Sequence, residues 1–196
     1  GIIKDKKWKG SMFNIRFGEL MSKIKKYMPE DIYYDRNIYK NPDKFLKKPS
    51  NIPIENENVK AQELAFDIDS DNIPCTHPKQ QKTCKICINK AFNYAKKMKK
   101  ELDGMFKDVK IVYSGRGFHL HVFDKKAFYL STKERGKLNK RFSKYPIDPW
   151  VSRGYIHLIR LPFSLNGLVS RRVVPVENMK KFNPESLILI PKFLYK

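Results

Sequence analysis

The segment Glu63-Leu-Ala-Phe-Asp-Ile-Asp69 has large apolar side chains two residues apart, the spacing of a half-buried β-strand. Because successive strand side chains point to opposite faces, three of them are expected to bury together: Leu64, Phe66 and Ile68. Asp67 and Asp69 then project side by side from the other face. Carboxylates this close repel each other unless a cation lies between them, and Mg²⁺ and Mn²⁺ prefer such oxygen ligands. The segment predicts a strand that presents a divalent metal site, and a solvated strand face is the alternative.

The charge of the chain favours a polyanionic partner. Its 196 residues include 41 Lys and Arg against 20 Asp and Glu, which gives a net charge of +21. Cations in such excess repel one another, and proteins that carry them usually bind a polyanion, most often nucleic acid. An anionic membrane, or a lysine-rich surface that is only well solvated, is the alternative. Hydrophobic residues make up 41% of the chain, enough for the core of one domain over residues 1–196.

The ends and the apolar runs of the chain favour a cytoplasmic protein. No run approaches the about 20 apolar residues that a membrane-spanning helix needs. The stretch that begins at Gly1 has no apolar core of a signal peptide. The chain starts with glycine rather than methionine, so either a cleaved tag or further domains of a longer chain are expected.

Periodicity predicts helices and strands that alternate along the chain, as in a mixed α/β (α+β) fold. Helices are expected over residues 17–28, 88–102 and 132–142. Besides the aspartate strand, strands are expected over residues 32–34, 111–113, 118–123, 155–160 and 172–176.

A metal site on the aspartate strand needs a third ligand from elsewhere. Asp148, in Tyr-Pro-Ile-Asp-Pro-Trp, is the best candidate because acidic residues are sparse in this part of the chain. The alternative is that Asp148 only starts a turn before Pro149, a role that aspartate fills well. Asp71 is expected to belong to the turn after the strand.

Three cysteines and a histidine form a second candidate site, Cys75-Thr-His77 followed by Cys84-Lys-Ile-Cys87. Zinc takes four nitrogen or sulfur ligands in a tetrahedron, and a Cys-x-x-Cys knuckle supplies two of them from one tight turn. Four protein ligands fill the coordination shell, so a structural Zn²⁺ is expected in a knuckle over about residues 73–90. The alternatives are a reduced, partly buried cluster, or a redox pair of Cys84 and Cys87.

The segment Ser114-Gly-Arg-Gly-Phe-His119-Leu-His121 begins with four residues that separate two predicted strands, and its remaining residues belong to the second strand. Its backbone N–H groups and its arginine can bind phosphate oxygens, as anion-binding nests do, although it is not a P-loop. The candidate nucleotide-binding residues here are Ser114, Gly115, Arg116, Gly117 and His119. A hairpin turn rich in glycine, and a histidine that is merely satisfied within a sheet, are the alternatives.

A second basic turn is Arg160-Leu-Pro-Phe-Ser164-Leu-Asn166. An arginine at a strand end, followed by a rigid proline turn and a serine, suits bidentate phosphate binding. Arg160 and Ser164 are therefore further candidates for nucleotide binding, and an ordinary ion pair of Arg160 is the alternative. Arg171 and Arg172 are expected to reach a template or a triphosphate, or else to be solvated charges.

The order of these motifs resembles the archaeo-eukaryotic primase superfamily, over about residues 32–176. A strand Asp-x-Asp, then Ser-Gly-x-Gly-x-His, a single Asp, and Arg-x-Pro-x-Ser follow one another as in that family. On this match the metal ligands are Asp67, Asp69 and Asp148. A zinc knuckle after the aspartate strand also occurs in primase small subunits.

The resemblance implies an α/β unit joined to an RRM-like unit, with the site between them. It implies a DNA primase/polymerase that binds single-stranded DNA template and primer, together with nucleoside triphosphates. The implied reaction is two-metal phosphoryl transfer with Mg²⁺ or Mn²⁺ about 4 Å apart, including synthesis of primers de novo. The lysine-rich surface and exposed tyrosines are expected to track the template by charge and stacking.

Asn166 stands where cellular primases often have histidine, and the chain is shorter than many members of the family. Both departures favour a compact primase-polymerase of a CRISPR-associated or mobile-element type. A non-catalytic nucleic-acid binder built on the zinc knuckle is the main alternative. A nuclease that uses the same carboxylates on water is another.

Overall fold

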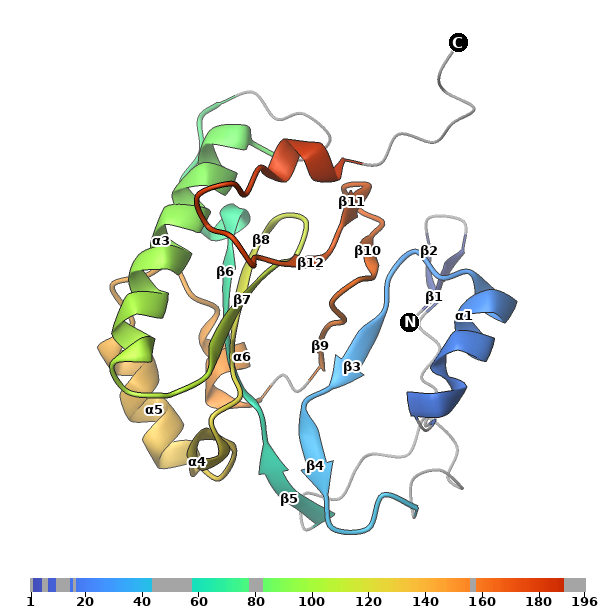
Figure 1. Cartoon of the computed structure of the whole chain (residues 1–196), viewed down its shortest axis with the longest axis horizontal. Helices are drawn as coiled ribbons and strands as arrows, with labels where there is room; N and C mark the ends of the chain where they lie inside the picture. The colour runs from blue at the N-terminus through green and yellow to red at the C-terminus, as the bar shows by residue number, and fades with distance from the viewer. Residues whose placement is uncertain are drawn as a thin grey trace.

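The computed structural model in Figure 1 is organised around a four-stranded antiparallel sheet with the strand order β12-β7-β8-β6. The structure describes residues 2–4, 7–9, 15, 17–43, 58–77, 83–155 and 158–188. The bounds of the sheet strands are β6 Leu64–Asp69, β7 Val109–Tyr113, β8 Gly117–Val122 and β12 Val174–Pro175. β6 lies at an edge of this sheet, which leaves one side of the aspartate strand open to other elements.

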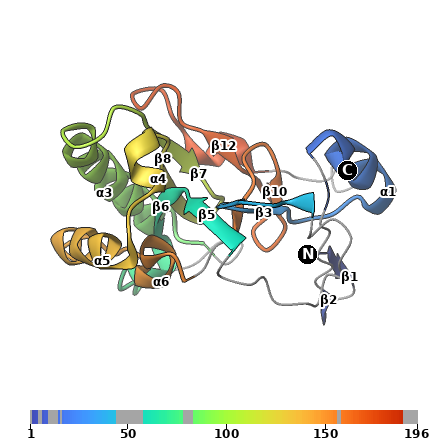
Figure 2. The same ribbon diagram turned by 90° about the horizontal axis from the view of Figure 1, so that it is seen from below.

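One face of the sheet carries the main hydrophobic core. The predicted apolar residues of β6 are fully buried there, and so are their partners on β8: Leu64, Phe66, Ile68, Phe118, Leu120 and Val122. Helix α3, Lys85–Asp103, covers this face with its own apolar stripe, which includes Ala91, Ala95, Met98 and Leu102 (Figures 1 and 2). The strand parity expected for the aspartate segment is confirmed.

The opposite face of β6 and β8 carries the polar side chains. The register places Asp67 opposite His119, and Asp69 opposite Gly117. Helix α6, Pro149–Arg153, packs beside β6, where Val151 is buried with Ala65. Helix α5, Thr132–Arg141, lies against α6, and the short helix α4 spans Lys125–Phe128.

The other described strands form short two-stranded ladders. Their strands are β1 Ile2–Lys4 with β2 Lys7–Lys9, β3 Tyr33–Asp35 with β9 Leu158–Arg160, β4 Asn37–Tyr39 with β5 Val59–Gln62, and β10 Leu165–Asn166 with β11 Arg171–Arg172. Helix α1 spans Leu20–Tyr27, and the 3-10 turns are η1 Phe17–Glu19, η3 Ser70–Asn72 and η4 Pro184–Leu187. The β3–β9 ladder brings two segments distant in the sequence to the polar face (Figure 1).

The mixed α/β fold predicted from the sequence is confirmed. Expected helices correspond to α1, α3 and α5 with shifts of a few residues at their ends. Of the expected strand over residues 155–160, residues 158–160 form β9, Tyr155 lies outside any strand, and residues 156 and 157 are outside the described part. The expected strand over residues 172–176 is wrong as a single element, because Val173 separates β11 from β12. Among the described residues, no helix combines the length and apolarity needed to cross a membrane.

Candidate active site and metal centre

Three carboxylates gather at the edge of the sheet. Asp67 and Asp69 lie on β6, and Asp148 is held beside them because its backbone N–H donates to the carbonyl oxygen of Asp67 at 2.8 Å. Burial, together with the negative charges of Asp69 and Asp148, raises the pKa of Asp67 to about 8. The structure therefore places Asp69 and Asp148 within electrostatic reach of Asp67, whereas among the described residues only a separate Cys/His group has ligand atoms close enough together to hold an ion as they stand.

This crowding is unfavourable for the ionised form of Asp67. A bound cation would favour the charged form, since an opposite charge nearby stabilises a carboxylate. Carboxylate oxygens are also the donors that Mg²⁺ and Mn²⁺ prefer, so this donor set fits such an ion. Asp148 also caps α6, with Oδ1 accepting the Trp150 N–H at 2.8 Å. Asp148 thus starts a helical turn, as the alternative interpretation expected, and it also lies near Asp67.

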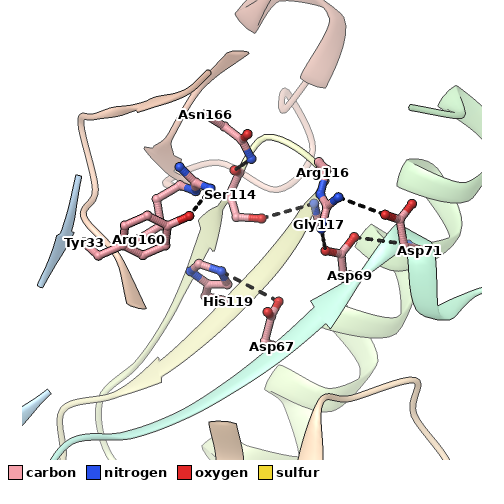
Figure 3. Close-up of polar contacts among 10 residues, drawn as sticks. All are labelled: Tyr33, Asp67, Asp69, Asp71, Ser114, Arg116, Gly117, His119, Arg160 and Asn166. Atoms are coloured by element: carbon pink, nitrogen blue, oxygen red, sulfur yellow. Dashed lines mark hydrogen bonds and ion pairs between the residues drawn. The ribbon is translucent and has the colours of Figure 1, made fainter. Parts of the chain in front are cut away.

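Arg116 neutralises the second carboxylate of the strand (Figure 3). Its guanidinium donates to Asp69 Oδ2 at 2.6 Å and also lies 2.9 Å from Asp71. Asp69 Oδ1 accepts the backbone N–H of Asp71 at 3.1 Å, which places Asp71 in the turn η3 as expected. In this structure the arginine predicted to bind phosphate serves as the counter-charge of two aspartates.

The segment from Ser114 to Gly117 is the hairpin turn between β7 and β8. The Ser114 N–H donates to the Gly117 carbonyl at 3.0 Å, and the Gly117 N–H donates to Ser114 Oγ at 3.2 Å. Gly115 has a φ of 97°, which favours glycine. A Cβ on Gly117 would lie 2.2 Å from the carbonyl oxygen of Ile68. The hairpin alternative is therefore correct, and it holds the turn against the aspartate strand.

Replacement of Gly117 by alanine is expected to force β8 away from Ile68 and Asp69. We expect a loss of about 1–3 kcal/mol in the free energy of unfolding, the usual cost of overpacking. Gly136, inside α5, is the matched control, because a Cβ added there would meet no described atom within 4 Å. Gly136→Ala should therefore stabilise the protein by about 0.5–1 kcal/mol. Urea denaturation of both variants measures this, and equal stability of the two would contradict the close-approach argument.

His119 extends the site away from the turn. Its Nε2 lies 3.7 Å from Asp67 Oδ1, and Nδ1 is buried with no hydrogen-bond partner in the described part of the chain. Burial, helped by the charges of His121 and Arg36, lowers the pKa of His119 well below its usual value. The imidazole is consequently neutral at physiological pH and can donate one hydrogen bond.

A buried acid–base network behind His119 was missed by the sequence reasoning. His121 Nδ1 lies 2.6 Å from Glu63 Oε1, and the Tyr34 hydroxyl donates to Glu63 Oε2 at 2.7 Å. The face shared by His119 and His121 was a usable signal, but Tyr34 comes from β3. Its contribution depends on the β3–β9 ladder, which brings residues 33–35 next to the sheet.

Arg160 lies at the far side of His119 from Asp67 (Figure 3). It is ion-paired with Asp31, donates to the Tyr33 hydroxyl at 2.6 Å, and lies over the Tyr33 ring at 4.7 Å. The ion-pair alternative for Arg160 is therefore correct in this structure. The pKa of Tyr33 is raised by burial, with Arg116 and Asp67 as opposing influences, so this pair lies within electrostatic reach of the aspartates.

The rest of the basic turn is built into the fold. The Ser164 hydroxyl donates to the Leu161 carbonyl at 2.6 Å, and Asn166 Nδ2 donates to the Ser114 carbonyl at 2.8 Å. Asn166 thus ties this turn to the β7–β8 hairpin. Both expectations for Arg171 are wrong, because its side chain is buried and donates to the Tyr113 hydroxyl at 2.8 Å. Arg172 is exposed.

The cysteine and histidine side chains converge between η3 and the start of α3. The possible ligand atoms of Cys75, His77, Cys84 and Cys87 all lie within 4.8 Å of one another. Cys84 caps α3 and accepts the Cys87 N–H at 3.5 Å. One nitrogen and three sulfur donors at this spacing fit tetrahedral zinc, so the group can hold a zinc ion. The predicted Cys/His cluster is confirmed.

Comparison with known proteins identifies relatives. Residues 66–145 match the family model described as DNA primase small subunit. A protein of Archaeoglobus fulgidus named "Uncharacterized DNA primase small subunit-like protein" is 39% identical over 192 residues, covering 90% of this chain and 68% of the relative.

DNA primase small subunits PriS are also similar. The protein of Pyrococcus abyssi is 38% identical over 53% of this chain, and that of Pyrococcus furiosus is 31% identical over 61%. These matches span only 30% and 33% of the two Pyrococcus proteins. The similarity to these PriS proteins therefore covers little more than half of this chain and about a third of each relative, and not a whole small subunit.

Proposed function

Because the chain belongs to the DNA primase small subunit family of the archaeo-eukaryotic primase superfamily, we propose that it is a template-dependent nucleotidyltransferase. It joins nucleotides on single-stranded DNA and starts primers de novo. The observation that carries the proposal is the gathering of Asp67, Asp69 and Asp148 beside the β7–β8 turn. These carboxylates would hold the catalytic Mg²⁺ or Mn²⁺. Such ions would lower the pKa of the attacking 3′-OH and offset the charge of the leaving pyrophosphate.

The triphosphate is held across the polar face of the sheet by residues of both basic turns, namely Ser114, Gly115, Arg116, Gly117, His119, Arg160 and Ser164. His119 supports this role because a neutral imidazole donates a hydrogen bond without repelling the neighbouring arginines. Arg116 exchanges Asp69 and Asp71 for phosphate oxygens when those carboxylates gain another counter-charge. The work of these residues is positioning and electrostatic stabilisation.

The proposed zinc ion has a structural role. Its four ligands, Cys75, His77, Cys84 and Cys87, would leave no open position for a substrate. The ion would fix the loop between β6 and α3, and hence the end of the aspartate strand.

The test is a product ladder from unprimed and primed single-stranded template, with ribo- or deoxyribonucleotides and Mg²⁺ or Mn²⁺. Template-length products without a primer are expected. Tight DNA binding with no product would favour the non-catalytic binder, and a shortened labelled primer would favour the nuclease. The cytoplasmic location, the single-domain organisation, the RRM-like unit and the CRISPR-associated or mobile-element type stay predictions.

A further inference from the structure

Two large aromatic side chains stand exposed next to the carboxylate cluster. Trp150 and Tyr155 are 60% and 56% exposed, and their ring centroids lie 5.5 Å apart at an interplanar angle of 58°. With Pro149 and Arg153 they line an open hollow of about 190 Å³. Paired exposed aromatics of this kind are unfavourable in water unless a partner covers them.

The local backbone holds the two rings in place. Asp148 caps the start of α6, and Gly154 ends it with a φ of 88°, a conformation that favours glycine. The Tyr155 N–H then donates to the Trp150 carbonyl at 3.0 Å, which folds the chain back so that the rings meet. Trp150 lies on α6 and Tyr155 lies directly after its C-cap, while Asp148 is the N-cap of the same helix. The two rings are therefore held close to Asp148.

The hollow carries one cation, and the helix that packs against α6 is rich in cations. Arg153 lines it, and helix α5 packs against α6 (Figure 2). Exposed cations on α5 are Lys133, Lys137, Lys140 and Arg141, whereas Lys144, just after the helix, is paired with Glu101 at 2.7 Å. Such a surface attracts the phosphates of a polyanion.

We propose that Trp150 and Tyr155 form a stacking site for a base of single-stranded DNA, with Arg153 and the α5 cations holding its phosphates. The proposal rests on the proposed function and locates the strand beside Asp148. Aromatic rings beside cations are the chemistry of single-strand binding, since every base has a π-face. A protein partner is a poorer fit, because a stable interface buries about 800 Å² on each side and this hollow takes only one flat group.

The test uses Trp150 fluorescence in the full chain. The sequence contains two tryptophans, so a Trp8→Phe background isolates the signal of Trp150. The probes are oligo(dT) and an abasic strand of equal length, without metal or nucleotide. We expect oligo(dT) to quench Trp150 and to bind about fivefold or more tightly than the abasic strand, since stacking contributes about 1–3 kcal/mol per base.

Trp150→Ala and Tyr155→Ala, followed by anisotropy of labelled strands, should each reduce this preference for bases. Tyr129→Ala is the matched control, because Tyr129 is 57% exposed but lies just after α4. Equal quenching by both strands, or an unchanged preference in both variants, would overturn the proposal. So would an emission change caused by protein concentration alone, which would assign the rings to self-association.

This binding assay is independent of catalysis. If oligo(dT) quenches Trp150 in a protein that makes no product, the stacking site is supported and the nucleotidyltransferase proposal is wrong. If the protein forms product without such quenching, the nucleotidyltransferase proposal is supported and the stacking site is wrong.

Discussion

Asp67→Asn is expected to reduce nucleotidyl transfer by about a thousandfold or more, because loss of a metal ligand removes several kcal/mol of transition-state stabilisation. Asparagine keeps the size of the side chain and removes only the charge. The pKa of Asp67 is raised to about 8 by burial and by the charges of Asp69 and Asp148. In metal-free wild-type protein at neutral pH, the Asp67 carboxyl must take up a proton on folding, a cost that asparagine does not have, so the melting temperature of the metal-free variant should stay equal or rise.

In Asp67→Asn, nucleotidyl transfer is therefore expected to fall while the melting temperature stays equal or rises. Primer extension with Mn²⁺ measures the first, and thermal denaturation in chelator measures the second. Asp103→Asn is the matched control, because Asp103 is a partly exposed residue at the end of α3 that pairs with Lys99. It should leave extension unchanged. Equal product from Asp67→Asn and the wild-type chain would remove the catalytic hypothesis.

Cys84→Ser is expected to cause the largest loss of stability in the chain. A structural zinc ion can supply on the order of 10 kcal/mol toward folding, and serine is a poor zinc ligand. Cys84 also caps α3, but serine is a good N-cap residue, so the expected loss of stability comes from the metal site and not from the helix cap. We expect a lower melting temperature and less than one zinc per chain by metal analysis.

Chelation separates the zinc effect from a packing effect. A strong zinc chelator should lower the melting temperature of the wild-type chain but change that of Cys84→Ser little further. Thr76→Ser is the matched control, since Thr76 is exposed between two ligands and contributes no ligand atom. Wild-type protein prepared without chelator that contains no zinc, or that is insensitive to the chelator, would contradict the structural role.

Local pattern was sufficient for much of the fold. The two-residue period of β6 and β8 determined which side chains face the main core, because strand geometry alternates faces whatever the surroundings, although the other face of β8 is buried as well. The Cys/His spacing identified a ligand cluster for a similar reason: a Cys-x-x-Cys turn brings its own sulfurs together. The Gly-rich break between two strands was equally local, since Ser114 and Gly117 close the hairpin through their own backbone groups.

Ion pairs between side chains that are distant in the sequence could not be predicted from local sequence patterns. Nothing in the local sequence indicated that Arg116 would bind Asp69 and Asp71, or that Arg160 would bind Asp31. Each pair joins segments that meet only when β6 aligns with β8 and β3 with β9. A cation pattern shows that a charge is present, whereas its partner depends on tertiary packing.

Strand parity, helix periodicity and short-range ligand spacing were thus determined by the sequence alone, because each depends on covalent geometry over a few residues. The tertiary structure alone decided that Asp148 lies beside Asp67, that Glu63 and His121 are buried together, and that Arg171 is buried. These outcomes depend on which faces pack together, and that choice is made by burial across the whole chain.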